Sequence, residues 1–203
     1  LVVLRNVPLF SGLDESELQR LSQVAVRRRA GRNEQVVRAG EDAESLIVLL
    51  TGRAKVTNFD EEGREIILAW LGPGEFFGEM GLIDGSPRSA SVVAVENCEL
   101  LSIGKNEFQR CMQDNFQVVL KLMQILVRRL READRNIESL ALLDVYGRVA
   151  RLLLDMSEEE GGKRMVKHKI SKQDMARMIG ASREMVSKVM RDLEVGGYII
   201  SEG

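Results

Sequence analysis

The stretch from residue 116 to 143 constrains the fold most, because it contains no glycine or proline and keeps a strict apolar spacing. Apolar side chains recur at alternating intervals of four and three residues, which is a heptad pattern. The seam consists of Val119, Met123, Leu126, Leu130, Ala133, Ile137 and Leu140. The pattern predicts one long helix that packs against its own domain or against a second copy, and the regular alternation favours a parallel dimeric coiled coil.

The chain before this seam has a different pattern of apolar residues. Between residues 31 and 102, short apolar or alternating runs follow one another, and glycines separate them. The runs cover residues 35–38, 46–50, 54–57, 66–71, 90–95 and 100–103. Many short strands at this spacing predict an antiparallel β-barrel or jelly roll. Gly52 and Gly63 stand where hairpin turns are expected.

Shorter helices are expected on both sides of these elements. Residues 11–29 predict a helix that Ser11 or Asp14 would cap. A helical period returns after Lys105, ahead of the long helix. Asp144 is expected to cap a further helix, which places a domain boundary where the long helix ends.

The region after residue 168 predicts a helix-turn-helix. Ser171 and Asp174 form a capping box for a helix that stops at Gly180, and a second helix over 183–193 begins after the N-cap Ser182. Two short helices joined through a glycine are typical of this DNA-binding motif, although a hairpin used only for packing is the alternative.

A wing is expected beyond the second helix. Residues 196–200 look like a turn followed by a first strand, whereas residues 157–163 look like a polar loop. His168 is expected in a strand of the wing. The sequence ends at Gly203 without a return strand, so we expect an incomplete wing, and because it starts without methionine we expect residues to precede Leu1.

The second helix of the motif would present a charged face to the DNA major groove. Arg183, Glu184 and Lys188 share its exposed side near the N-terminus. Arginine and lysine donate to guanine, and glutamate accepts from cytosine. Three more polar residues are expected to hold phosphates, namely Ser182, Lys172 and Arg177. Residues 163–194 carry a net charge of +5 against −7 for the remainder, which fits a local polyanion-binding surface, although such charge can also be simple solvation.

A glycine-rich segment over residues 74–94 carries a second set of candidate binding residues. Gly78 permits a close backbone approach, and a short helix starting here would aim free N–H groups at an anion. Arg88 offers a planar fork for a phosphate, and Ser89 adds a hydroxyl. Glu79 would accept from a ribose hydroxyl, so the set fits a phosphate esterified to ribose. The alternative is a barrel loop with a surface ion pair between Glu79 and Arg88.

These motifs resemble the CRP/FNR family of transcription regulators over nearly the whole chain. The most specific pieces are Phe77-Gly78-Glu79 with Arg88-Ser89-Ala90, the run Leu142 to Arg148, and Gly180 to Glu184. The resemblance implies an α+β chain with a cyclic-nucleotide-binding β-barrel or jelly-roll domain (1–115), a dimerisation helix (116–143) and a winged helix-turn-helix DNA-binding domain (144–203).

The resemblance also assigns roles to residues. It implies that a cyclic nucleotide is held by Gly78, Glu79, Met80, Arg88 and Ser89, and by Ala133 and Asp134 of the long helix. It implies a homodimer that binds double-stranded DNA with two-fold symmetric half-sites resembling TGTGA, and contact with RNA polymerase. Lys188 stands where cyclic AMP-responsive members carry arginine, so the half-site is expected to differ in detail.

The long helix departs from the family pattern where such members carry a Thr-Ser pair that meets adenine. Here the pair is Ala133-Asp134. An ionised carboxylate only accepts hydrogen bonds, and guanine offers two adjacent donors. We therefore expect cyclic GMP or cyclic di-GMP to compete with cyclic AMP, unless Asp134 pairs with Arg131 or Arg135. Arg88→Ala is expected to abolish the response to the ligand and to leave folding intact.

Composition narrows the class of protein further. With two cysteines and one histidine, no metal site, disulfide framework, iron–sulfur sensor or metal oxygenase is expected, so the chain is not expected to be an enzyme. No apolar run reaches the length of a membrane span, and a cytoplasmic protein is expected. Two alternatives remain: a regulator that binds DNA without ligand or is inhibited by it, and a cyclic-nucleotide module that regulates a partner protein.

Overall fold

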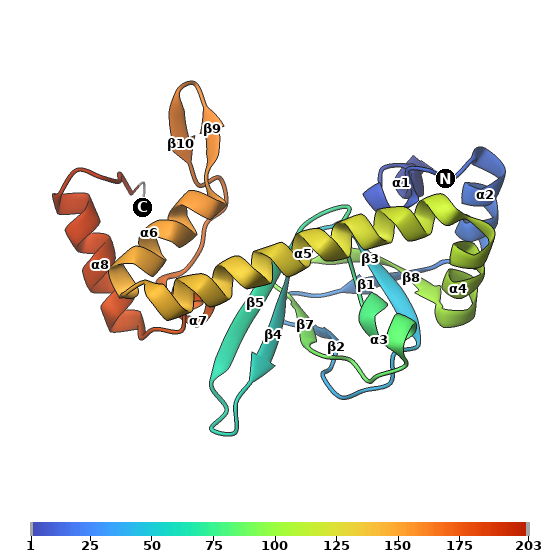
Figure 1. The fold of residues 1–203 in the computed structure, drawn as a ribbon, viewed down its shortest axis with the longest axis horizontal. Helices are drawn as coiled ribbons and strands as arrows, with labels where there is room; N and C mark the ends of the chain where they lie inside the picture. The colour runs from blue at the N-terminus through green and yellow to red at the C-terminus, as the bar shows by residue number, and fades with distance from the viewer. Residues whose placement is uncertain (1, 202–203) are drawn as a thin grey trace. The chain divides into compact units, whose positions relative to one another are not determined.

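The computed structural model describes residues 2–201 and divides into two compact units, Leu1–Arg128 and Arg129–Gly203. One helix, α5 (Phe116–Leu142), runs without interruption through the point of division and is drawn as a single long coil in Figure 1. The predicted long helix is therefore confirmed almost to the residue. The expectations about residues before Leu1 and about a strand beyond Gly203 lie outside the described residues.

The first unit is built on two four-stranded antiparallel sheets. One sheet has the order β1-β8-β3-β6 and the other the order β2-β7-β4-β5. The strands of the first are β1 (Val26–Ala30), β8 (Cys98–Gly104), β3 (Ser45–Thr51) and β6 (Phe76–Phe77). Those of the second are β2 (Gln35–Val37), β7 (Ser91–Ala94), β4 (Ala54–Phe59) and β5 (Glu65–Leu71). The arrangement is jelly-roll-like rather than a closed barrel.

Strand β3 explains how the first sheet can be buried on both faces. Its side chains alternate between two apolar clusters: Leu46 and Val48 lie in one, and Ile47 and Leu49 lie in the other. Successive side chains of a strand point to opposite faces, so an uninterrupted apolar run is what a doubly covered strand requires. The second cluster fills the space between the two sheets, where Val92 and Ala94 meet it from β7.

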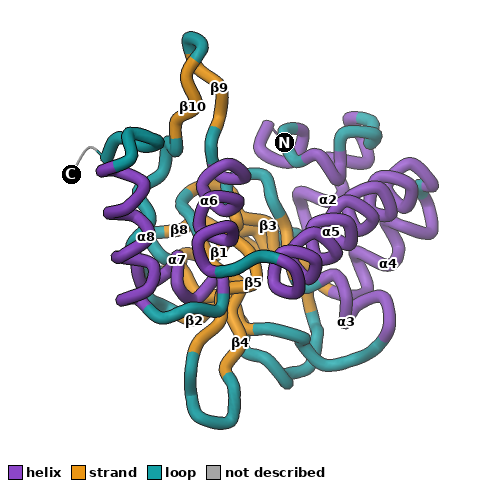
Figure 2. The backbone as a smooth tube through the Cα atoms, turned by 60° about the vertical axis from the view of Figure 1, so that its left-hand side comes forward, coloured by secondary structure: helices purple, strands orange, loops and turns teal. Residues whose placement is uncertain are grey.

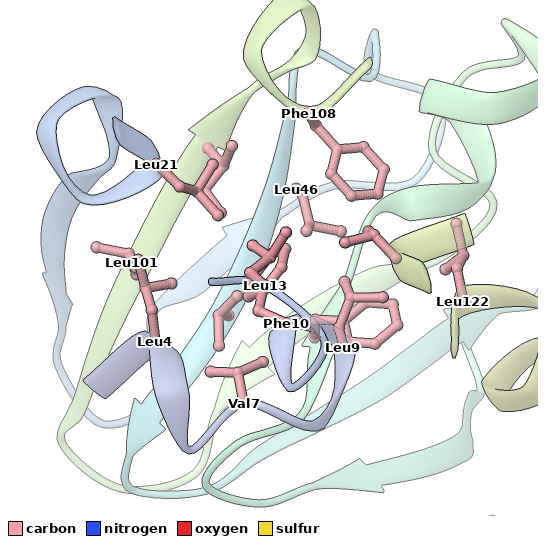
Figure 3. Close-up of a cluster of buried hydrophobic side chains, with 14 of the residues drawn as sticks. Leu4, Val7, Leu9, Phe10, Leu13, Leu21, Leu46, Leu101, Phe108 and Leu122 are labelled. Carbon is pink, nitrogen blue, oxygen red and sulfur yellow. The ribbon is translucent and has the colours of Figure 1, made fainter. Parts of the chain in front are cut away.

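Helices cover the other face of the first sheet. They are α1 (Val2–Arg5), the 3₁₀ turn η1 (Pro8–Phe10), α2 (Glu15–Val24), α4 (Lys105–Asp114) and the first half of α5. Figure 3 shows leucines and phenylalanines from these helices meeting strand residues such as Leu46 and Leu101. Phe10 and Phe108 are fully buried there. The long helix contributes Val118, Leu122 and Ile125, so this stripe of α5 is used by its own domain.

Two local predictions for this unit need correction. The helix expected over residues 11–29 ends at Val24, and residues 26–29 belong to strand β1. Its cap is Asp14, which accepts a hydrogen bond from the amide of Glu17 in a complete capping box. Gly52 adopts a positive φ but links strands of different sheets, β3 and β4, rather than a hairpin.

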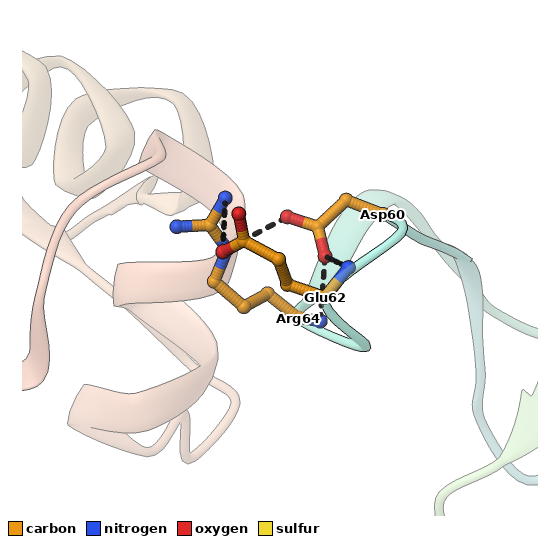
Figure 4. A network of polar contacts seen from close by, with 3 residues as sticks. All are labelled: Asp60, Glu62 and Arg64. Atoms are coloured by element: carbon orange, nitrogen blue, oxygen red, sulfur yellow. Dashed lines mark hydrogen bonds and ion pairs between the residues drawn. The ribbon is translucent and has the colours of Figure 1, made fainter.

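The hairpin turn expected at Gly63 is present between β4 and β5. Asp60 organises it by accepting from the amides of Glu62 and Arg64, at 3.0 and 2.9 Å, and from Arg64 Nε at 2.7 Å (Figure 4). These contacts, led by the backbone hydrogen bond from Arg64, lower the pKa of the Asp60 carboxyl below its ordinary value.

The second unit packs three helices around one apolar core. They are α6 (Val145–Met156), α7 (Lys172–Ile179) and α8 (Arg183–Val195). Asp144 caps α6 by accepting from the amide of Gly147, as predicted. The core comprises Val149, Met175, Ala176, Ile179, Val186, Val189, Met190 and Leu193.

The wing is placed differently from the sequence prediction. The polar segment expected to be a loop forms a hairpin of β9 (Glu158–Glu160) and β10 (Lys163–Met165), which extends away from the helices of this unit in both Figure 1 and Figure 2. Residues 198–200, expected to start the wing, are not in a strand, and His168 lies in a bend rather than a strand. Among the described residues, no helix is long and apolar enough to cross a membrane.

Candidate nucleotide cassette and DNA-reading helix

The glycine-rich segment turns from strand to helix at Gly78. This residue follows β6 with φ +88° and caps the short helix α3 (Glu79–Asp84), so a helix does begin where the sequence predicted one. A Cβ at Gly78 would lie 1.8 Å from Arg88 Nη1 and 3.0 Å from the carbonyl oxygen of Ser45. Only glycine therefore fits this position, because both the backbone conformation and the space exclude a side chain.

Arg88 is buried and already has hydrogen-bond partners within the protein. Its side chain is 8% exposed, Nη1 donates to the carbonyl oxygen of Gly78 at 2.9 Å, and Nη2 donates to the carbonyl oxygen of Ser45 at 2.7 Å. Burial lowers the pKa of Arg88, and the carboxylates of Glu79, Glu41 and Glu44 oppose that shift.

Glu79 is the acidic counterpart of Arg88 in the cassette, which consists of Gly78, Glu79, Met80, Arg88 and Ser89. It is 3% exposed and is the first residue of α3. Of the three carboxylates that act on Arg88, that of Glu79 has the largest effect on the guanidinium. A buried carboxylate beside a buried guanidinium is an arrangement that proteins keep at some cost, since each charge must be withdrawn from water. The surface ion pair considered as the alternative is therefore not what the structure contains.

The remaining predicted cassette residues lie at the rim. Ser89 is exposed, and its hydroxyl contacts Met80 Sδ at 3.7 Å. Met80 is 52% exposed. Ser89 also accepts a hydrogen bond at its carbonyl oxygen from Asn58 Nδ2 at 3.1 Å, which ties the cassette to β4. The structure thus brings Gly78, Glu79 and Arg88 together in the interior and leaves a hydroxyl and a thioether on the outside.

Sequence reasoning did not identify the loop over residues 40–44, whose backbone forms hydrogen bonds with the backbone of Arg88. The Gly40 amide donates to the carbonyl oxygen of Arg88, and the Arg88 amide donates to that of Glu41, both at 2.8 Å. The loop also brings Glu41 and Glu44 near the guanidinium. The acidic run Glu41-Asp42-Ala43-Glu44 was the available signal, but nothing in the sequence linked it to position 88.

The long helix presents most of its predicted seam to solvent. Met123, Leu130, Ile137 and Leu140 are about half exposed or more, at 48%, 61%, 64% and 54%. Val119 and Leu126 are partly buried, and Leu126 packs against the helical cluster of the first unit. Ala133 and Asp134 are exposed residues of α5 in the second unit. A continuous apolar stripe left uncovered along a helix is typical of an interface.

The helix-turn-helix has the capping chemistry that the sequence predicted. Ser171 accepts from the amide of Asp174 at 3.0 Å and starts α7, although Asp174 accepts from the Ser171 hydroxyl rather than from its amide. Gly180 ends α7 in the left-handed conformation. Ser182 starts α8 by accepting from the amide of Met185 at 3.2 Å.

Helix α8 separates an apolar face from a charged face. Val186 and Val189 are buried in the core, whereas Arg183, Glu184 and Lys188 are exposed. The three charged residues line a shallow groove of about 420 Å³, together with two residues that sequence reasoning missed, Ser187 and Arg191. Positions 184, 188 and 191 follow the helical period, so the period alone would have found Arg191.

The predicted phosphate ligands differ in their availability. Ser182 and Lys172 are exposed, at the beginnings of α8 and α7. Arg177 is half-buried and lies 3.5 Å from the Asp174 carboxylate. Within residues 2–201, no group of three or more histidine, cysteine, aspartate or glutamate side chains is placed to hold a metal ion.

A jelly-roll domain with a buried Glu–Arg cassette, followed by a long helix and a helix-turn-helix, defines a ligand-controlled DNA-binding regulator. Two family descriptions match the chain: cyclic nucleotide-binding domain over residues 27–115 and Crp-like helix-turn-helix domain over residues 147–203. The chain belongs to the CRP family of transcription regulators, and the family is one of regulators rather than enzymes.

Named relatives support the same assignment. The chain is 37% identical over 172 residues to the cAMP-activated global transcriptional regulator CRP of Haemophilus influenzae, covering 83% of this chain and 77% of that protein. It is 30% identical over 205 residues to a CRP-like cAMP-activated regulator of Mycobacterium tuberculosis, covering 99% and 92%.

Solved structures show the likeness of the fold. The c-di-GMP responsive global regulator CLP of Xanthomonas campestris superposes with a TM-score of 0.79 at 30% identity, covering 94% of this chain and 96% of that one. The catabolite activator protein of Thermus thermophilus gives a TM-score of 0.60 at 32% identity, covering 97% and 91%. Relatives at similar identity thus respond, by their names, to two different cyclic nucleotides.

Proposed function

We propose that a cyclic nucleotide binds at the cassette and controls how this regulator binds DNA. The observation that carries the proposal is the buried guanidinium of Arg88 beside the buried carboxylate of Glu79, with Gly78 leaving room for the guanidinium. A planar fork suits a phosphate, and a carboxylate accepts from a ribose hydroxyl. Met80 and Ser89, at the exposed rim, would complete the contacts with the nucleotide.

The identity of the nucleotide depends on the long helix. Asp134 is exposed on α5, and an ionised carboxylate matches the two adjacent donors of guanine better than the single amine of adenine. We therefore propose that cyclic GMP or cyclic di-GMP competes with cyclic AMP, with Ala133 and Asp134 against the base.

Isothermal titration of the protein with each of the three nucleotides tests this proposal. Asp134→Asn should shift the preference toward adenine, because an amide also donates. Glu132→Gln, which removes an exposed carboxylate two residues earlier on the same helix, is the control and should not shift it. A preference of the wild-type protein for cyclic AMP by tenfold or more would contradict the guanine proposal.

The working state is proposed to be a homodimer on two-fold symmetric DNA. The exposed apolar stripe of α5 would pair with its copy through the seam Val119, Met123, Leu126, Leu130, Ala133, Ile137 and Leu140. Two reading helices α8 would then enter successive major grooves roughly 34 Å apart. Arg183, Glu184 and Lys188 would read the bases of half-sites resembling TGTGA, and Ser182, Lys172 and Arg177 would hold phosphates.

Two further proposals follow from regulation of transcription. The protein would act in the cytoplasm, where DNA is accessible and where its two free thiols, Cys98 and Cys111, would stay reduced. Bound near a promoter, it would contact RNA polymerase. Transcription in vitro from a promoter bearing the half-sites, with purified polymerase and with or without the regulator, tests the second proposal.

A regulator that binds DNA without ligand, or whose DNA binding the ligand inhibits, is the second candidate. It is favoured by one observation: both terminal nitrogens of Arg88 donate to backbone carbonyls of the protein itself, so the fold holds the guanidinium in place through its own contacts. Gel-shift measurements with and without each nucleotide distinguish the candidates. DNA affinity that rises with nucleotide supports activation, whereas equal or lower affinity supports the second candidate.

A further inference from the structure

A cavity lies between α2 and α4 in the first unit, and none of the cassette residues lines it. The two helices lie side by side, and α5 begins directly after α4 (Figure 1). The cavity has a volume of about 190 Å³. A cavity of roughly 150 Å³ can hold one aromatic ring, whereas a drug-sized ligand needs roughly 300 Å³ or more. The space between α2 and α4 therefore suits a small metabolite.

The floor of this cavity is apolar and is not fully covered by the protein. It consists of Leu13, Leu21, Val24 and Cys111. Leu13 and Leu21 are 9% and 5% exposed, whereas Val24, the last residue of α2, is 47% exposed. Apolar surface inside a concavity, with a few polar groups around it, is the usual lining of a small-molecule site. A branched aliphatic group in the cavity would cover this floor.

The rim of the cavity carries charges of both signs. It comprises two cations and three carboxylates, namely Arg20, Arg110, Glu17, Glu107 and Asp114. Within the part of the chain that the structure describes, the side chains of Arg20, Arg110 and Asp114 form no ion pair. Charges of both signs are thus available to a ligand from two different helices.

Glu17 is held in a fixed position at this rim. Its Oε2 accepts from the amide of Asp14 at 2.7 Å, and its Oε1 accepts from Asn115 Nδ2 at 2.9 Å. Asn115 in turn accepts at Oδ1 from the amide of Gln117 at 3.0 Å, in the first turn of α5. A carboxylate has lone pairs for further donors, so Glu17 can accept from a ligand without losing these contacts. Such preorganisation lowers the cost of binding.

The pKa of the Cys111 thiol indicates the sign of the electrostatic potential at the floor. Burial is the largest cause that raises this pKa to about 11, the carboxylates of Glu17 and Asp114 raise it further, and Arg20 opposes them with the smallest effect. The inner part of the cavity therefore favours a positive group. Arg20 and Arg110 are exposed, so a negative group is favoured nearer to solvent.

We propose that this cavity binds a free amino acid with an apolar side chain of the size of leucine. Its ammonium group would donate to Glu17 and Asp114, its carboxylate would accept from Arg110, and its side chain would cover the apolar floor. A ligand with a single charge would leave the opposite charges of the rim unpaired, whereas a zwitterion complements both. This site is separate from the cassette and does not depend on the nucleotide proposed there.

Isothermal titration of the full chain with leucine tests the site, together with two analogues that each lack one charge. The analogue 4-methylpentanoate has no ammonium group, and 3-methylbutylamine has no carboxylate. Leucine should bind saturably, and each analogue should bind about tenfold more weakly, because one charged hydrogen-bonding group is removed. Absence of saturable leucine binding, or equal binding of either analogue, would overturn the proposal.

Two variants locate the bound leucine. Arg110→Gln should weaken leucine binding about tenfold, and Arg32→Gln, at an exposed arginine outside the cavity, is the control. Cys111→Met should also weaken binding, because the longer side chain occupies the floor, while Cys111→Ser leaves the space open and should bind leucine normally. Full leucine affinity in Arg110→Gln or in Cys111→Met would show that the amino acid binds elsewhere.

Competition with cyclic AMP separates this cavity from the cassette. Because the two sites share no residue, an excess of cyclic AMP should not displace leucine. Displacement would place leucine at the cassette and overturn the proposal. A protein that binds leucine but none of the cyclic nucleotides would contradict the proposed function and leave the amino acid site intact.

Discussion

The charged side chains of the two binding regions differ in burial, since those of the cassette are buried and those of the reading helix are exposed. In the cassette, Arg88 and Glu79 are buried, and the arginine already donates to two backbone carbonyls. On the reading helix, Arg183 and Lys188 extend into solvent from a helix whose other face is core. A buried charge is part of the fold, whereas an exposed charge can be exchanged with little effect on stability. Substitutions in the cassette should therefore alter folding and binding together, and those on α8 should alter binding alone.

Arg88→Ala should give the largest loss of stability. It leaves the carbonyls of Gly78 and Ser45 without their donor and removes the buried cation on which the Glu79 carboxylate acts, which should cost about 3 kcal/mol. Chemical denaturation measures this change. The sequence-based expectation that folding stays intact is not yet tested, and these contacts lead us to expect a variant that folds with lower stability. Arg64→Ala, in an exposed turn of the same unit, is the control. Equal stability of the two variants would contradict the view that the buried charge of Arg88 is part of the fold.

Gly78→Ala should lower the free energy of unfolding by about 2 kcal/mol, because alanine is strained at a positive φ and its Cβ would collide with neighbouring atoms. Gly85→Ala is the matched control, because Gly85 has φ +76° but no atom within 4 Å of the position of a Cβ. Both variants share the backbone strain, so the difference between them isolates the collision of the Cβ with Arg88 and with the carbonyl oxygen of Ser45. If denaturation curves of the two variants coincide, the side chain of Arg88 moves aside freely, and the cassette is less rigid than its hydrogen bonds indicate.

Lys188→Ala should leave the unfolding midpoint unchanged and weaken specific DNA binding by about 1–2 kcal/mol, as expected for one base contact. Anisotropy titrations with the half-site duplex and with a scrambled duplex separate base reading from phosphate contact. An equal loss on both duplexes would assign Lys188 to phosphates. A fall in the unfolding midpoint would remove the distinction between the two regions.

Cys111 offers a smaller test of burial in the first unit. Burial, together with the carboxylates of Glu17 and Asp114, raises the pKa of its thiol from an ordinary 9.0 to about 11. Because the folded pKa is raised, the stabilisation is complete below pH 9 and is lost as the pH rises toward 11. Alkylation by iodoacetamide, with Cys98→Ala as background, should therefore stay slow at pH 9. Rapid alkylation at that pH would contradict the raised pKa of the Cys111 thiol.

The elements that sequence reasoning found share a local signal. The run 46–50 is apolar throughout because both faces of β3 are covered, and α5 shows its period over 27 residues. The caps Asp14, Asp144 and Ser182 act within three residues of themselves. Such features depend on neighbours along the chain, and so the sequence alone contains them.

The elements that were missed either lacked such a signal or depended on distant contacts. The hairpin of β9 and β10 has polar strands, although its Gly161-Gly162 turn, with φ of +59° and +77°, was a readable mark of a two-residue hairpin. The partner of Arg88 at Ser45 lies 43 residues away, and no local pattern joins the two. Residue types predicted the chemistry of the cassette, but only the fold shows that its arginine is already engaged.

The composition of the β9–β10 hairpin has a consequence for how DNA affinity responds to salt. Glu160 faces Lys163 and Glu159 faces Arg164 across the ladder, and Glu158 pairs with Lys167 at 2.8 Å. A segment whose charges balance displaces few ions from the atmosphere around a duplex. The slope of DNA affinity against salt concentration, on logarithmic axes, should therefore be set by the cations of α7 and α8. Replacing the charged residues of both hairpin strands by neutral ones should leave this slope almost unchanged.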